Sequence, residues 1–255
     1  PEKLYINLVC RKHCDPLSAN APDKQMPLAV FKRLIDETAQ YVKNYALAIG
    51  GEALFLKDFE KRLLYIRHNK LSNATIDLHT FGEALTPDNI SLLRDNSVKV
   101  NVSFCSPTNN LHTKISGKSN FVNICENLQK LASAYNNVDI SYTPALYVRI
   151  HKLNQNKLLA MTRLAKELGI KRIGFWLLNN PTYKAAVPSK MLRKELEEVY
   201  RLVDKSGMLL WLYPLRVGNH VFSGTQYRPV ANYILNTNCC APVVSSTVDY
   251  NGDVY

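Results

Sequence analysis

Cys10 and Cys14 lie close together near the start of the chain, with three residues between them. The apolar run 4–9 precedes them and predicts a short buried strand, so both thiols follow the end of a strand. Thiolates at such a distance on one loop can bind one metal centre. Neighbouring cysteines also occur without any metal, so the pair by itself leaves both interpretations open.

A second group of residues that could bind a ligand is Gly50, Gly51 and Glu52, directly after the apolar run 45–49. Two glycines allow the backbone to come close to a ligand and to adopt conformations that other residues avoid. The neighbouring carboxylate can accept charge-assisted hydrogen bonds from an ammonium group. The same three residues would also serve as an ordinary strand-to-helix turn with a glutamate on the surface.

Strands and helices alternate along most of the chain. Strands are predicted over 4–9, 45–49, 75–79, 98–104, within 138–150, and over 171–178 and 208–213; helices are predicted over 27–43, 57–67, from 86 onward, and over 121–135, 156–168 and 189–205. Such alternation is typical of βαβ units around a parallel sheet, either doubly wound or arranged as a barrel. It stops after residue 213, where turn residues, two adjacent cysteines and the turn signal Asn251-Gly252 predict the start of a smaller second unit.

The order of these features resembles the radical S-adenosylmethionine (SAM) superfamily, in which a cysteine loop follows the first strand and a Gly-Gly-Glu run follows the second. The resemblance continues after the third predicted strand, where residues 78–82 read Leu-His-Thr-Phe-Gly and residues 85–88 read Leu-Thr-Pro-Asp. It includes the end of the fourth strand, which reads Val-Ser-Phe-Cys-Ser-Pro at 102–107. In all, the similar features span about residues 4–180.

The resemblance implies a fold and a reaction. Residues 1–213 are expected to form an α/β fold, a partial (β/α)6 TIM-like barrel with its active site at the C-terminal ends of the strands. The family cleaves SAM reductively with a [4Fe–4S] cluster, and the resulting 5′-deoxyadenosyl radical abstracts hydrogen from a substrate. By this resemblance the expected cluster ligands are Cys10 and Cys14, and the expected SAM-binding residues are Gly50, Gly51, Glu52 and Ser103.

One departure from the family motif concerns the third cluster ligand. The family spacing is Cys-x-x-x-Cys-x-x-Cys, and the third position holds Leu17 here. Three thiolates bind three irons and leave the fourth iron for SAM, whereas leucine has no ligating atom. Two alternatives follow: a catalytically degenerate radical SAM-like barrel that acts as a SAM-binding or scaffold protein, or a sequence that is altered near Asp15.

The C-terminal segment resembles the beginning of a SPASM or twitch-like extension, which is expected over residues 214–255. In SPASM domains a cysteine precedes a glycine turn similar to that at Gly252, and another cysteine follows the turn. By this resemblance Cys239 or Cys240 is a first ligand of an auxiliary iron–sulfur cluster in an incomplete domain. The alternative is a pair of buried loop thiols.

The remaining thiols and the two tryptophans are expected mainly at structural positions. Cys105 is placed at the barrel mouth, as either a catalytic hydrogen-atom donor or an ordinary thiol at a strand end. Cys125 falls on the apolar face of a predicted helix and is expected in the core. Trp176 and Trp211 are also expected to be core residues, and Arg149 faces either a ligand carboxylate or the barrel interior.

Composition limits the partners. The chain of 255 residues carries 32 basic and 21 acidic residues, a net charge of +11, and its basic residues are scattered. This distribution argues against nucleic-acid binding and suits an acidic leader peptide as substrate. The resemblance implies a peptide or small-molecule substrate and an electron donor such as flavodoxin or ferredoxin.

No signal peptide and no apolar run of about 18 residues is visible, so a cytoplasmic protein without a membrane span is expected. A further hypothesis is a two-layer α/β binding or scaffold protein outside the family.

Overall fold

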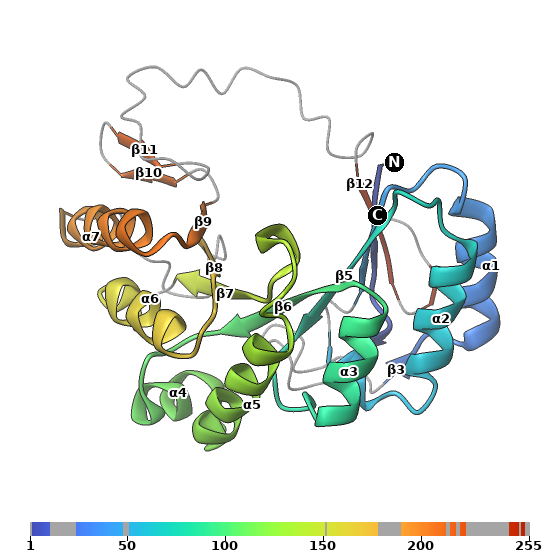
Figure 1. Cartoon of the computed structure of the whole chain (residues 1–255), viewed down its shortest axis with the longest axis horizontal. Coiled ribbons are helices and arrows are strands. Elements are labelled where there is room, and N and C mark those ends of the chain that lie inside the picture. The colour runs from blue at the N-terminus through green and yellow to red at the C-terminus, as the bar shows by residue number, and fades with distance from the viewer. Residues whose placement is uncertain are drawn as a thin grey trace. The chain divides into compact units, whose positions relative to one another are not determined.

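The computed structural model describes residues 2–10, 24–47, 51–150, 152–177, 190–212, 215–217, 220–222, 245–249 and 251–252. The chain divides into two compact units: unit 1 comprises residues 1–101 and 237–255, and unit 2 comprises residues 102–236. Strand β6 (Val98–Phe104) crosses the division, so its two ends belong to different units. Figure 1 shows the helices and strands of both units.

Unit 1 contains a sheet with the strand order β12-β1-β4-β5-β6. Its strands are β1 (Lys3–Ile6), β4 (Asn44–Leu47), β5 (Thr75–Thr80), the first part of β6, and β12 (Ser245–Val248). β1 pairs in parallel with both β4 and β12, and β4 pairs in parallel with β5. The helices are α1 (Leu28–Thr38), the 3-10 helix η2 (Ala53–Phe55), α2 (Phe59–Asn69) and α3 (Pro87–Asp95).

In unit 2 the strand order is β6-β7-β8-β9. The strands β7 (Ala145–Ile150), β8 (Arg172–Leu177) and β9 (Leu209–Leu212) pair in parallel. The helices are α4 (Asn109–Ser116), α5 (Phe121–Ala134), the 3-10 helix η3 (Ile140–Tyr142), α6 (Leu158–Glu167) and α7 (Lys190–Ser206). A separate antiparallel pair consists of β10 (Leu215–Val217) and β11 (His220–Phe222).

The expected fold class is confirmed. From β1 through β4, β5, β6, β7 and β8 to β9, the strands are neighbours in the order in which they occur along the chain. Helices connect these strands, which is the arrangement that successive βαβ units produce. In the described part of the chain β12 and β9 stand at opposite ends of the strand order, so the sheet is open, as expected for a partial barrel.

Apolar spacing and capping residues account for the positions of the helices. In α1 the buried residues are Phe31 and Ile35, which are four apart and therefore share one face of the helix. Thr86 caps α3, where its hydroxyl accepts the backbone N–H of Asn89 at 3.2 Å. Pro87 occupies the first turn, where its missing N–H costs no helical hydrogen bond. Local sequence signals therefore fix these helix starts and buried faces.

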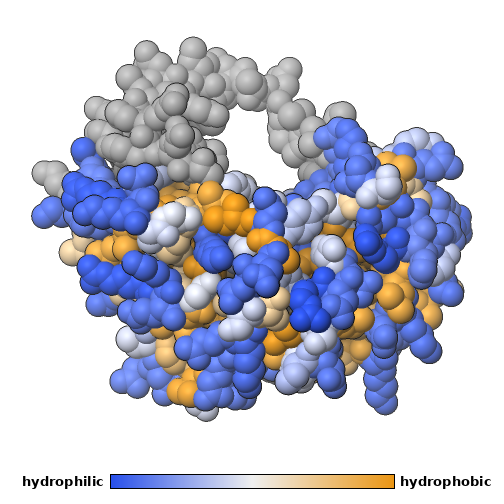
Figure 2. Space-filling model, in the orientation of Figure 1, coloured by the Kyte–Doolittle hydropathy of each residue, from blue (hydrophilic) through white to orange (hydrophobic). Residues whose placement is uncertain are grey.

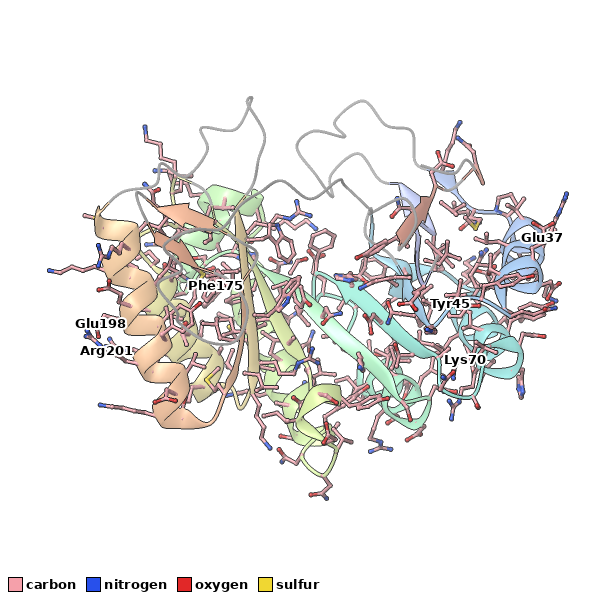
Figure 3. The ribbon with its side chains drawn as sticks, turned by 90° about the horizontal axis from the view of Figure 1, so that it is seen from above. Glu37, Tyr45, Lys70, Phe175, Glu198 and Arg201 are labelled. Atoms are coloured by element: carbon pink, nitrogen blue, oxygen red, sulfur yellow. The ribbon has the colours of Figure 1, made fainter. Side chains whose placement is uncertain are left out.

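Each unit has its own apolar core. Tyr45 in β4 and Phe175 in β8 are fully buried (Figure 3). Charged residues such as Glu37, and the ion pair of Glu198 with Arg201, lie on outer helix surfaces. Figure 2 shows a face that is mostly hydrophilic, with apolar patches between the charged residues. Among the described helices, none has both the length and the apolar character that a bilayer crossing requires.

The tail of the chain returns to the first strand, a contact that the sequence did not predict. β12 lies beside β1 in parallel register, with Ser245 opposite Lys3 and Val248 opposite Ile6. The turn predicted at Gly252 follows, and the N–H of Gly252 donates to the Asp249 carbonyl at 3.0 Å. Most of residues 214–255 lies outside the described residues, so the expected division between 1–213 and 214–255 stays a prediction.

Candidate functional site

Glu52 follows β4 and caps the short helix η2. Its side chain is buried, with only 4% of the residue exposed. Oε2 accepts the Thr80 hydroxyl at 2.6 Å and the Phe81 N–H at 2.8 Å. Oε1 accepts a longer hydrogen bond of 3.4 Å from the Leu54 N–H. The carboxylate is therefore held in one place by the last residue of β5, by the residue that follows β5 and by its own turn.

Burial raises the pKa of Glu52 above its ordinary value of 4.5. Hydrogen bonds from Thr80, Phe81 and Leu54 lower the pKa of this carboxyl in part, and the nearby charge of Glu83 raises it. A bound cation stabilises the ionised form of a buried carboxylate, because the positive charge offsets the hydration that the carboxylate has lost. The site is thus suited to an ammonium or another compact cation.

Gly51, the residue before Glu52, is also buried, whereas Gly50 lies outside the described residues. Ser103 is half-buried near the end of β6. Glu52 belongs to unit 1 and Ser103 to unit 2, so their joint contact with one ligand stays a prediction.

The cysteine loop starts and ends in a small strand pair within unit 1. β2 (Val9–Cys10) pairs in antiparallel fashion with β3 (Lys24–Gln25), so that Cys10 lies opposite Lys24. The Met26 N–H then donates to the Leu8 carbonyl at 2.9 Å. Residues 11–23, which include Cys14 and Leu17, lie outside the described residues.

The cysteine loop and the Glu52 turn follow neighbouring strands. β1 and β4 are parallel, with Ile6 opposite Leu47 at their C-terminal ends. Cys10 comes four residues after the first of these ends, and Glu52 five residues after the second. Both therefore leave the same edge of the unit 1 sheet, as predicted from the sequence. In parallel α/β sheets, ligands bind at this edge.

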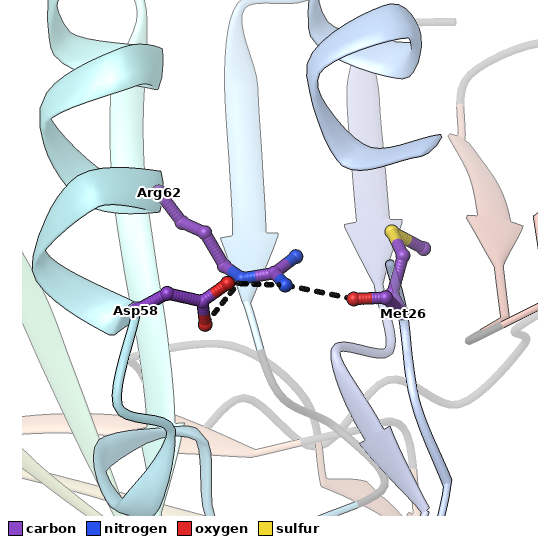
Figure 4. A network of polar contacts seen from close by, with 3 residues as sticks. All are labelled: Met26, Asp58 and Arg62. Atoms are coloured by element: carbon purple, nitrogen blue, oxygen red, sulfur yellow. Dashed lines mark hydrogen bonds and ion pairs between the residues drawn. The ribbon is translucent and has the colours of Figure 1, made fainter. Parts of the chain in front are cut away.

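Arg62 anchors the segment that leads out of the cysteine loop (Figure 4). This arginine of α2 is 1% exposed, and its Nη2 donates to the Met26 carbonyl at 2.7 Å. Asp58 neutralises it through two hydrogen bonds, at 3.0 Å and 2.8 Å. The sequence signal for this pair was its i,i+4 spacing, but the contact with Met26 spans 36 positions and had no local signal.

The donor set of the cysteine loop does not fit a [4Fe–4S] cluster held by three thiolates. Cys10 and Cys14 supply two sulfur ligands, and position 17 supplies none because leucine has no ligating atom. Over the described ranges, no three histidine, cysteine or acidic side chains gather in a way that could bind a metal. Cys239 and Cys240 lie outside those ranges, so the auxiliary cluster stays a prediction.

Cys105 in unit 2 contacts a histidine. Its Sγ lies 3.7 Å from Nδ1 of His112, and Nε2 of His112 lies 2.8 Å from Oδ1 of Asn120. With Asn120 as acceptor, the histidine hydrogen sits on Nε2, and Nδ1 accepts the thiol hydrogen. Burial raises the pKa of Cys105 to about 11, so the thiol stays protonated at neutral pH. The arrangement suits a hydrogen donor better than a thiolate nucleophile.

The two tryptophans are not the core residues that the sequence predicted. Tyr147 contacts both rings, with centroid distances of 5.2 Å to Trp176 and 5.7 Å to Trp211. The Arg149 guanidinium lies 5.9 Å from the Trp176 ring centroid, and 39% of Trp211 is exposed. Cys125 is likewise half-buried instead of fully buried. Period-two and helical patterns assign residues to a face, but whether that face is covered depends on the neighbouring elements.

The sequence of residues 10–165 matches the profile of the Radical SAM superfamily, over more than half of the chain. No curated protein matches the sequence significantly.

Solved structures share the fold at low sequence identity. SuiB from Streptococcus suis bound to the precursor peptide SuiA has a TM-score of 0.70 and 12% identity, covering 100% of this chain and 58% of SuiB. SuiB bound to S-adenosylmethionine has a TM-score of 0.70 and 13% identity, covering 100% of this chain and 59% of SuiB. For anSMEcpe with bound AdoMet and Cp18Cys peptide, the TM-score is 0.58 at 14% identity, covering 80% of this chain and 59% of the other. The chain thus spans less than two thirds of the length of each of these proteins.

Proposed function

Because the chain belongs to the radical SAM superfamily, we propose that the loop after β4 binds SAM through Glu52, in support of radical chemistry on a peptide. The general reaction of the superfamily is reductive cleavage of SAM to a 5′-deoxyadenosyl radical, which abstracts hydrogen from the substrate. The observation that carries the proposal is the buried Glu52 carboxylate, held in place at the ligand-binding edge of the sheet.

The surroundings of Glu52 fit the ammonium group of SAM. Two carboxylate oxygens offer about four acceptor sites, and the described residues occupy three of them. An ammonium at the remaining site would form a charge-assisted hydrogen bond and restore the charge balance of the buried carboxylate. Gly50 and Gly51 are proposed to let the backbone approach the same group, and Ser103 to contact the ribose.

Leu17 supports a second candidate function. A two-thiolate loop should hold a cluster only weakly, since the ligand bonds are what retain it. The alternative is therefore a degenerate barrel that binds SAM or acts as a scaffold without cleaving SAM. Cys105 is a candidate hydrogen-atom donor only if the protein cleaves SAM. Its thiol is protonated and hydrogen-bonded to His112, which supports that role.

A peptide is the proposed substrate class. SuiB was solved with a precursor peptide and anSMEcpe with a Cp18Cys peptide, and both share the fold of this chain. The net charge of +11 favours an acidic peptide, and it equally favours an acidic electron donor such as flavodoxin or ferredoxin. Cys239 and Cys240 are proposed to contribute to an auxiliary iron–sulfur cluster within a SPASM-type extension.

Anaerobic reconstitution with iron and sulfide tests the two functions. The ultraviolet–visible spectrum and the iron and sulfide content report any cluster, and calorimetry reports SAM binding. Under a chemical reductant, release of methionine and 5′-deoxyadenosine would support the enzyme. SAM binding without iron and without these products would support the degenerate barrel that binds SAM. No SAM binding would contradict the proposed role of Glu52 and would leave only the scaffold.

A further inference from the structure

The buried face of β5 ends in a polar residue. Ile76, Leu78 and Thr80 alternate along the strand and are 1%, 0% and 2% exposed. Apolar residues are expected on a covered strand face, whereas a buried threonine hydroxyl needs hydrogen-bond partners. A polar residue at the end of such a face breaks the apolar pattern of the strand, and breaks of this kind often mark functional positions.

The hydrogen bonds of Thr80 have a defined direction. The Gly82 N–H donates to Thr80 Oγ1 at 3.0 Å, so the oxygen is an acceptor there. Its single hydroxyl proton is then directed to Glu52 Oε2 at 2.6 Å. Gly82 has a φ of +85°, a conformation that favours glycine, and this turn also brings the Phe81 N–H to the same carboxylate oxygen.

We infer that Thr80 is a positioning residue for SAM binding, which holds the Glu52 carboxylate so that Oε1 is left to accept the ammonium group of the ligand. Oε2 already accepts two hydrogen bonds, and Oε1 accepts one long hydrogen bond from Leu54 among the described residues. One acceptor site therefore remains on Oε1, in a direction set by the contacts of Oε2. This inference deepens the proposed function and rests on it.

Thr80 also affects the protonation of Glu52. Burial raises the pKa of Glu52, and the hydrogen bond from Thr80 is the largest of the influences that lower it; the N–H groups of Phe81 and Leu54 lower it less, and the charge of Glu83 raises it. Loss of the Thr80 hydroxyl must raise the pKa of Glu52 further. An ammonium binds the ionised carboxylate, so a variant without this hydroxyl should lose SAM affinity at a higher pH than the wild type as the pH falls.

Calorimetric titration of the whole chain with SAM over a range of pH tests the inference. Thr80→Val keeps the shape of the side chain without the hydroxyl and should weaken SAM binding about tenfold, the usual size for a hydrogen bond to a charged group. Thr80→Ser restores the hydroxyl and should recover most of the affinity. Binding of 5′-methylthioadenosine, which lacks the ammonium group, should be the same in all three proteins.

Thr162→Val is the matched control. Thr162 is fully buried in α6 of unit 2, and its hydroxyl donates to the Leu158 carbonyl of the same helix at 2.9 Å. This variant replaces a buried threonine hydroxyl with a methyl group, as Thr80→Val does. It should keep the SAM affinity of the wild type and the pH dependence of that affinity. A loss of affinity as large as that of Thr80→Val would show a general effect of losing a buried hydroxyl and would overturn the inference.

Glu52→Gln separates failure of this inference from failure of the proposed function. Unchanged SAM affinity in Glu52→Gln would remove the proposed role of Glu52 itself. Weaker binding in Glu52→Gln together with unchanged binding in Thr80→Val would overturn only the role of Thr80. If Thr80→Val does not fold, Thr80→Ala takes its place, and equal SAM affinity of the alanine and serine variants would overturn the inference.

Discussion

The guanidinium of Arg62 forms two hydrogen bonds with the carboxylate of Asp58, from Nε to Oδ1 at 3.0 Å and from Nη2 to Oδ2 at 2.8 Å. The Arg62 side chain is 1% exposed, whereas that of Asp58 is 27% exposed. A buried cation is thus neutralised by a partner that keeps contact with solvent. The same arginine holds the Met26 carbonyl, so the pair links α2 to the segment after the cysteine loop.

Loss of Asp58 should destabilise the protein more than loss of both partners. Asp58→Asn leaves the Arg62 charge buried without a counter-ion, and we expect the free energy of unfolding to fall by about 2 kcal/mol or more. In the double variant Asp58→Asn/Arg62→Met the buried charge is absent, so the loss should be smaller than in the single variant. Urea unfolding of the three proteins measures both differences.

The exposed pair of Arg33 with Glu37 serves as the control for this prediction. It has the same i,i+4 spacing, but its side chains are 82% and 60% exposed. Glu37→Gln should therefore change the free energy of unfolding by less than about 0.5 kcal/mol. An equally small effect of Asp58→Asn would show that Arg62 does not depend on its counter-ion.

Glu52→Gln should stabilise the ligand-free protein at neutral pH. Burial raises the pKa of Glu52 above 4.5, so the folded state favours the protonated form. This contribution to stability is fully present below pH 4.5 and is lost as the pH rises through the folded-state pKa. Glutamine cannot ionise, so the gain in melting temperature over the wild type should appear at neutral pH and vanish in acid.

Glu2→Gln provides a comparison of opposite sign. Its hydrogen bond and ion pair with Lys43 lower the pKa of Glu2. Here the ionised form favours folding, so glutamine should bring no gain in melting temperature at neutral pH. A gain in Glu2→Gln equal to that in Glu52→Gln would contradict burial as the cause of the Glu52 effect.

Cys105 and Cys125 should react slowly with alkylating reagents in the folded protein. Burial raises the pKa of each thiol from an ordinary value of 9.0 to about 11. At neutral pH the thiolate fraction then falls about a hundredfold, and alkylation should slow by a similar factor. Mass spectrometry of the cysteine peptides measures the rates, with guanidinium-unfolded protein as reference. Equal rates in the folded and unfolded protein would show that the thiols are not shielded.

Leu17→Cys should raise the iron content after reconstitution and permit SAM cleavage under reduction. The third thiolate completes the family spacing and should hold the cluster more firmly, because ligand bonds retain it. Ala19→Cys is the matched control, since it adds a thiol to the same loop at the wrong spacing. Iron analysis and 5′-deoxyadenosine measurement compare the two variants.

Two results would contradict this prediction in different ways. If Leu17→Cys binds no more iron than Ala19→Cys, the loop is not a damaged cluster site, and the barrel is better regarded as a binding scaffold. If the unaltered protein already holds a cluster that cleaves SAM, then Leu17 is no defect, and a ligand such as Asp15 or His13 completes the site.

Local pattern was enough to locate the strands β1, β4, β5, β6, β7, β8 and β9. The strand predicted over 98–104 has these bounds in the structure, because three valines and Phe104 alternate with polar residues along it, which is the pattern of a strand. The predicted helix over 121–135 ends within one residue of α5, since its apolar spacing is regular. Parallel strands in chain order then place Cys10 and Glu52 at one edge of the unit 1 sheet.

By itself, then, the sequence determined the α/β class, the sequential order of the strands from β1 through β4 to β9, and the edge at which Cys10 and Glu52 lie. Only the tertiary structure decided which distant groups meet: Thr80 with Glu52, Arg62 with Met26, and β12 with β1. It also decided that Trp211 is partly exposed. The physical reason is that periodicity and capping act between residues a few positions apart, whereas side-chain hydrogen bonds and burial depend on elements that come together only when the sheet assembles.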